Sequence, residues 1–127
     1  MPLKGVFASM SFTQLKTPED VRELLAGSDR EPVFLLKHSS QCPISAGVYS
    51  AFSEFERQGG ADRPWTCALV RVIEERPLSN QIEEQLGVRH ESPQLLLISG
   101  SKVLWHDSHW RLTLEKMHEV AGRFLQS

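Results

Sequence analysis

The chain has 127 residues, of which 40% are apolar and 24% charged, and its 14 basic and 16 acidic side chains leave a formal net charge of −2. This composition is typical of a soluble globular protein and gives no indication of a nucleic-acid partner. No apolar run approaches the ~18 residues that a membrane span needs, and the N-terminus lacks the apolar stretch of a secretory leader. We therefore expect a cytoplasmic protein that forms one domain over residues 1–127 and has no membrane partner.

Periodicity and turn residues predict an alternation of strands and helices. In chain order these are a strand at residues 11–15, a helix at 18–27 after an N-cap at Thr17, a strand at 33–37, a helix at 43–59, a strand at 65–73, a helix at 77–86 capped by Gly87, strands at 91–99 and 102–106 joined by a tight turn, and a last helix opened by Thr113. The strand at 65–73 is almost continuously apolar, which predicts an interior place in the sheet. The order βαβαβαββα predicts an α/β fold, a central mixed sheet with helices on both faces.

One cysteine lies where a predicted strand passes into a predicted helix. Proline is favoured at the first helical position, so Pro43 makes Cys42 the N-cap and directs the backbone N–H groups of Ile44 and Ser45 toward its sulfur. A helix N-terminus lowers a cysteine pKa from about 8.5 into a range of roughly 3.5 to 7.5, and the thiolate is the nucleophile. This position favours thiol chemistry, although a small buried cysteine that merely precedes a proline is the simpler alternative.

The residue three positions after Cys42 decides which thiol chemistry is available. A dithiol oxidoreductase has a second cysteine there, and this chain has Ser45. A serine can donate a hydrogen bond to a thiolate but cannot resolve a mixed disulfide, so turnover needs an outside thiol or the second cysteine, Cys67. Cys67 falls in the apolar strand at 65–73 and is most simply a buried core thiol.

The chain resembles the thioredoxin fold in two features. A Cys-Pro-x-Ser motif joins a strand to a helix, and a proline precedes a later hairpin strand. In that fold the late proline is cis and faces the catalytic sulfur, and Ser92-Pro93 has the matching position. Residues 37–45, Lys-His-Ser-Ser-Gln-Cys-Pro-Ile-Ser, more specifically resemble the motif of the YtxJ-type monothiol bacilliredoxins. The resemblance continues through Ile73-Glu74, residues 87–94 and residues 105–109, and it departs from the family at Gln41, where threonine is usual.

This resemblance implies removal of the thiol bacillithiol from cysteines of other proteins. Cys42 would attack the mixed disulfide, release the repaired protein and become bacillithiolated itself. Bacillithiol is then the thiol co-substrate, S-bacillithiolated proteins are the partners, and we expect a monomer with no tightly bound cofactor or metal. In the thioredoxin fold the backbone before the cis-proline pairs with the bound substrate, which nominates Ser92 beside Pro93, and Arg89 is the candidate for the malate carboxylates of bacillithiol.

Further candidates for substrate contact surround the motif. Gln41 and Ile44 flank the Cys-Pro pair, while Lys37 and His38 end the preceding strand, where either could add positive potential beside the sulfur. Because side chains alternate along a strand, Lys37 and His38 should lie on opposite faces of the sheet. The alternative for both is a solvated charge at a strand end.

Other groups of polar and aromatic residues give weaker indications of function. A zinc site made from His106, His109 and His90 or Cys42 matches no known ligand spacing. The carboxylates at positions 74, 75, 83 and 84 are expected on the solvated surface, and Trp110, near a loop, could contact a partner.

Two other functions stay open. The same fold could act as a binding or adaptor domain that recognises client peptides along Ser92-Pro93, with an inert Cys42. Monothiol glutaredoxins hold an iron–sulfur cluster, but they have glycine and phenylalanine after the cysteine, whereas this chain has Pro43 and Ile44.

Overall fold

The computed structural model describes residues 12–41, 43–59 and 64–125. The elements in chain order are β1 (Thr13–Gln14), α2 (Pro18–Gly27), β2 (Val33–His38), α3 (Pro43–Gly59), β3 (Thr66–Arg71), α4 (Arg76–Leu86), β4 (Gln94–Ser99), β5 (Lys102–Ser108), a 3-10 turn η2 (His109–Arg111) and α5 (Leu114–Leu125). This order is the predicted alternation of strands and helices, ended by a hairpin and a helix.

The strands form one mixed five-stranded sheet in the order β1-β3-β2-β4-β5. β3 pairs in parallel with β1 and β2, whereas β4 pairs antiparallel with β2 and β5. The parallel pairs thus come first in the chain and the antiparallel hairpin last, and β3 lies inside the sheet, as its apolar sequence predicts.

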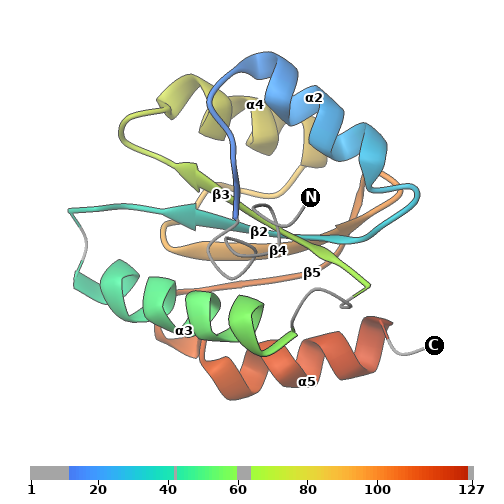
Figure 1. Ribbon diagram of the computed structural model, residues 1–127. Coiled ribbons are helices and arrows are strands. Elements are labelled where there is room, and N and C mark those ends of the chain that lie inside the picture. Colours follow the sequence, from blue (N-terminus) through green and yellow to red (C-terminus); the bar gives the residue numbers. More distant parts are fainter. Residues whose placement is uncertain (1–11, 42, 60–63, 126–127) are drawn as a thin grey trace, which may run out of the picture.

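Two helices cover each face of the sheet. Figure 1 shows α2 and α4 on one face and α3 and α5 on the other. β2 supplies both cores by simple alternation, because Phe34 and Leu36 pack toward α3 and α5, while Val33 and Leu35 pack toward α2 and α4. The α/β class with helices on both faces is confirmed.

The ends of several strands differ from the prediction. β3 stops at Arg71 rather than at residue 73, because the chain turns there. Val72 N–H still donates to the carbonyl of His38 at 2.9 Å, and Glu75 N–H then donates back to Arg71 O at 2.8 Å. β4 starts at Gln94, after a proline that has no N–H to give to a ladder. β5 runs on to Ser108, which pairs with Gln94, and this extension brings its end beside the start of β4.

Caps at three helix ends match the sequence signals. Thr17 caps α2 in a reciprocal capping box with Asp20. Gly87 ends α4 with a φ of 72°, a conformation that glycine adopts without strain, and the Thr113 hydroxyl accepts from Lys116 N at the start of α5. Within the described part of the chain, none of these helices has the length and apolarity needed to cross a bilayer.

Candidate functional site

The passage from β2 to α3 forms the centre of the candidate site. β2 ends at His38 and α3 begins at Pro43, so Pro43 is the first helical residue, as predicted. Cys42 directly precedes it in the sequence and lies outside the described residues. Ser40 and Gln41, which form a turn before it, and Pro43 itself are all exposed.

Ser45 holds this turn from the inside. Its side chain is fully buried, and its Oγ accepts a hydrogen bond from Ser39 N at 3.3 Å, while Ser39 Oγ accepts from Gln41 N at the same distance. A hydroxyl that accepts in this way keeps its own proton for donation. Ser45 therefore has a structural role in the turn and retains the donor that the sequence analysis assigns to it.

His38 lies on the α3 face of the sheet. Its ring centroid is 5.1 Å from that of Tyr49 in α3, and its Nδ1 is buried with no hydrogen-bond partner among the described residues. Burial lowers the pKa of His38, the charge of Arg71 lowers it further, and Glu74 opposes both. At neutral pH the imidazole is therefore uncharged, so it adds no positive potential to the site but can accept a proton.

Lys37 leaves β2 on the opposite face, as strand alternation predicts, but it is not a solvated charge. Only 1% of it is exposed, and its Nζ lies 3.3 Å from Nδ1 of His90 and 3.5 Å from the carbonyl oxygen of Ser79 in α4. Burial lowers its pKa to about 8, against the opposing charge of Glu83. The sheet lies between this ammonium and α3, so the expectation that Lys37 contacts substrate is corrected.

The loop before β4 reaches the same end of the sheet. The Ser92–Pro93 peptide bond is cis, which confirms the sequence prediction. Gln94 pairs with Lys37 across β4 and β2, so Pro93 lies beside the end of β2, from which the chain continues toward Cys42. Ser92 is half-buried and its Oγ has no partner among the described residues, while Arg89 is exposed.

Two sets of contacts at this loop escaped the sequence analysis. Ser108 Oγ donates to Glu91 Oε1 at 2.8 Å and lies 2.9 Å from Nδ1 of His109, whose backbone N–H donates to Pro93 O at 3.0 Å. Glu83, expected on the solvated surface, accepts a hydrogen bond from His90 N at 3.1 Å in an exposed contact. Apart from the neighbours Ser108 and His109, these partners are 7 to 17 residues apart in sequence, and no local pattern signals their contacts.

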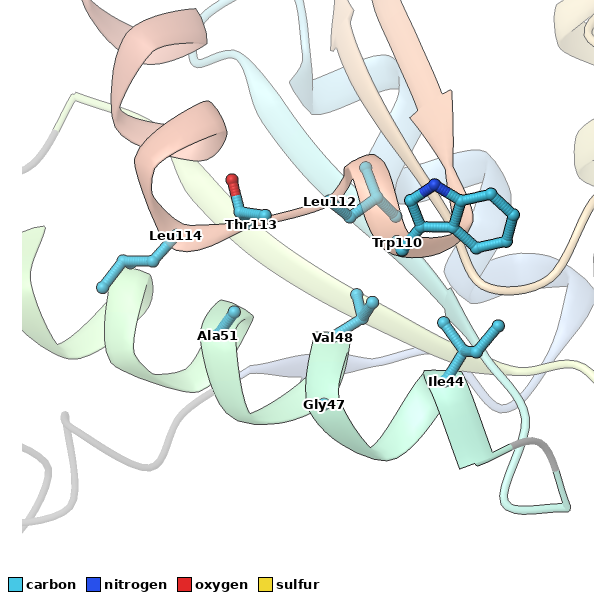
Figure 2. A pocket seen from close by; sticks show the side chains of 8 residues that line it. All are labelled: Ile44, Gly47, Val48, Ala51, Trp110, Leu112, Thr113 and Leu114. Atoms are coloured by element: carbon cyan, nitrogen blue, oxygen red, sulfur yellow. The ribbon is translucent and has the colours of Figure 1, made fainter.

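An apolar groove of about 380 Å³ runs along α3 away from this turn. Its lining residues come from α3, from the segment between β5 and α5, and from the first residue of α5: Ile44, Gly47, Val48, Ala51, Trp110, Leu112, Thr113 and Leu114. Figure 2 shows Ile44 and Trp110 facing each other at the end of the groove where α3 begins. Trp110 is 70% exposed, an unusual position for so large an apolar side chain.

Solved structures with the same arrangement are thioredoxins and related oxidoreductases. The chain superposes with a TM-score of 0.76 and 26% identity on a protein described as a candidate oxidoreductase with a thioredoxin fold, over 89% of this chain and 96% of the other. Schistosoma mansoni thioredoxin gives a TM-score of 0.71 at 13% identity, over 92% and 98%. Thioredoxin from Trypanosoma brucei brucei gives 0.73 at 9% identity, over 92% and 93%. The protein therefore has a thioredoxin fold.

The match to a family model is more specific than the match to the fold. Residues 13–117 match the model of the family described as monothiol bacilliredoxin BrxC, and the chain belongs to this family. Fold and family together support a thiol–disulfide oxidoreductase kind of function.

Cys67 is fully buried in β3, on the core side that faces α3 and α5. Among the described residues no group of three or more His, Cys, Asp or Glu side chains could hold a metal ion.

Proposed function

We propose that this protein removes bacillithiol from S-bacillithiolated proteins through Cys42. The Cys42 thiolate attacks the bacillithiol sulfur of the mixed disulfide, a new S–S bond forms between these two sulfurs, and the client cysteine leaves as a thiolate. One disulfide is exchanged for another, so the step needs no external oxidant or reductant. A separate thiol must then reduce the bacillithiolated Cys42.

The observation that carries this proposal is the family match over residues 13–117 together with the start of α3 at Pro43. A helix that begins there offers its unpaired N-terminal amides to the preceding residue, and such amides stabilise a thiolate. The exposure of Gln41 and Pro43 leaves room for a large disulfide to approach.

Neighbouring residues supply the remaining parts of the proposed mechanism. Ser45 donates its hydroxyl proton toward the thiolate while its oxygen accepts from Ser39 N. The uncharged His38 provides a proton acceptor close to the end of β2. The backbone of Ser92 pairs with the bound disulfide, and the exposed Arg89 binds the malate carboxylates of bacillithiol.

Client proteins need a surface beyond the disulfide itself, and we propose the groove beside α3 for this contact. It begins at Ile44, two residues after Cys42, and the exposed Trp110 forms its rim. Tryptophan is enriched among the residues that dominate binding energy at interfaces. Gln41 and Ile44 then contact the client near its modified cysteine.

Incubation of a bacillithiolated test protein with the wild type and with the Cys42→Ser and Cys67→Ala variants tests the proposal. We expect the wild type and Cys67→Ala to strip the client at similar rates, because Cys67 is buried in the core. The Cys42→Ser variant should leave the client modified. Stripping by Cys42→Ser would refute the mechanism.

The second candidate function is a binding domain of the same fold with an inert Cys42. The rate of alkylation of Cys42 against pH separates the two functions. An ionisation midpoint well below 8.5 supports catalysis, whereas a midpoint at the ordinary value favours the inert domain.

We further propose that residues 1–127 act as one thioredoxin-like domain, as a monomer in the cytoplasm, with S-bacillithiolated proteins and bacillithiol as partners. The two helix layers and one sheet account for residues 12–125 apart from the short undescribed segments. Light scattering of the purified protein checks the monomer.

A further inference from the structure

Four polar side chains meet on the face of the sheet that α3 does not cover. They are Lys37 from β2, Ser79 and Glu83 from α4, and His90 from the loop that follows α4. Nδ1 of His90 lies 3.3 Å from Lys37 Nζ and 3.1 Å from Ser79 Oγ, and Lys37 Nζ also lies 3.5 Å from Ser79 O. The proposed mechanism uses none of these contacts.

A buried ammonium is costly, because it gives up hydration that a few protein acceptors must replace. The pKa of Lys37 is about 8, so at neutral pH the ammonium is charged. Burial and the charge of Lys37 both lower the pKa of His90, so its ring is neutral there. Lys37 therefore donates to Nδ1 of His90, and Glu83 is the nearby counter-charge.

His90 is also held through its backbone. Its N–H donates to Glu83 Oε2 at 3.1 Å, so α4 binds the main chain of the loop, while Lys37 of β2 and Ser79 of α4 contact the side chain. One residue earlier, the carbonyl of Arg89 accepts from Gln94 Nε2 at 3.0 Å. Gln94 is the strand partner of Lys37, so the same two strands fix both residues.

The loop fixed in this way is the one that leads to Pro93. His90 is three residues from Pro93, and Pro93 O accepts from His109 N, next to Trp110 at the mouth of the groove. The contacts of Lys37 thus end at the surface where a client disulfide would lie, although Lys37 itself never reaches that surface.

We propose that Lys37 is a positioning residue, whose buried ammonium holds His90 and thereby sets the backbone of residues 89–93 for binding the client disulfide. This inference rests on the proposed function, and it gives Lys37 an effect on substrate binding. It does not act on ionisation of Cys42, because the ammonium lies on the far face of the sheet and Glu83 offsets its charge.

The test uses Lys37→Met, which removes the charge and keeps an unbranched side chain only one atom shorter, and His90→Ala. Single-turnover transfer from a bacillithiolated protein is measured against client concentration, together with alkylation of Cys42 against pH. For each variant we expect the half-saturating client concentration to rise about fivefold. The maximal rate and the alkylation midpoint should stay at the wild-type values.

The double variant and a control complete the experiment. Lys37→Met with His90→Ala should raise the half-saturating concentration no further than His90→Ala alone, because Lys37 acts through the His90 side chain. Lys102→Met, at an exposed lysine at the start of β5, should behave as wild type. If Lys37→Met does not fold, His90→Ala, at an exposed position, still decides the question.

Two results overturn the proposal. One is a shifted alkylation midpoint with unchanged half-saturation, which would make Lys37 an electrostatic neighbour of the thiol. The other is wild-type behaviour of both variants. Amide hydrogen exchange of residues 87–92 tests the positioning role separately from the proposed function. Faster exchange in Lys37→Met supports positioning even if the wild type fails to accept bacillithiol. Unchanged exchange contradicts it.

Discussion

The backbone N–H of His109 donates a 3.0 Å hydrogen bond to the carbonyl oxygen of Pro93. This bond joins the loop before β4 to the turn after β5, and Ser108 strengthens the junction through Glu91 and His109. The surface proposed for the client disulfide is therefore built from two segments that stabilise one another.

Removal of the Ser108 hydroxyl should loosen this junction. Ser108 is only 2% exposed and its Oγ contacts both Glu91 and His109, so Ser108→Ala leaves both groups short of a partner. We expect the free energy of unfolding to fall by about 1 to 2 kcal/mol, measured by denaturant titration. Ser50→Ala, at an exposed position of α3, should cost nothing, because alanine is the better helix former. Equal effects of the two changes would argue against the junction.

A second thiol at position 45 should change the chemistry from monothiol to dithiol. In Ser45→Cys the new thiol lies one helical turn after Cys42 and can attack its sulfur, releasing bacillithiol and forming an intramolecular disulfide. Mass spectrometry after one turnover should then show the variant without an adduct and two hydrogens lighter. Ser50→Cys, five residues further along α3 and exposed, should keep the adduct as the wild type does. A stable adduct on Ser45→Cys would contradict the proposed placement of Cys42.

Lys37 should make stability depend on pH in the alkaline range. Its pKa of about 8 lies below the ordinary 10.5, so between these values the unfolded chain binds more protons than the folded one, and stability rises with pH. We expect the stability of wild type relative to Lys37→Met to rise by about 3 kcal/mol between pH 7 and pH 10.5. Unfolding of both proteins across this range provides the measurement. A difference that does not vary with pH would show that the ammonium is not destabilised by burial.

Trp110 should matter for protein clients and not for small ones. Its 70% exposed side chain forms the rim of the groove, so Trp110→Ala should lower the transfer rate from a bacillithiolated protein by about tenfold. The rate with a mixed disulfide of bacillithiol and cysteine, which is too small to fill the groove, should not change. Phe124→Ala, at another exposed aromatic residue near the end of α5, is the control. Equal losses with both substrates would exclude the groove as a client surface.

The local parts of the fold followed from the sequence because they depend on local rules. Pro43 predicted the start of α3, Thr17 the cap of α2, and the alternation of β2 the opposite faces of Lys37 and His38. Burial of Lys37 was not predictable, because it depends on how α4 packs over the end of β2.

The contacts around the Pro93 loop were beyond sequence reasoning for a similar reason. Glu91 and Ser108 meet only because β5 runs two residues further than its apolar pattern indicates. The uncharged state of His38 follows from its burial and from Arg71 in the neighbouring strand, and neither is visible without the sheet register.

The most direct test of the central claim is to locate bacillithiol after a single turnover. The wild-type protein is mixed with an excess of a bacillithiolated client, quenched with acid, digested and mapped by mass spectrometry. The account predicts one adduct, on the peptide that contains Cys42, in equal amount to the client thiol released. Release of the client thiol with no adduct on Cys42, or with the adduct on Cys67, would contradict it.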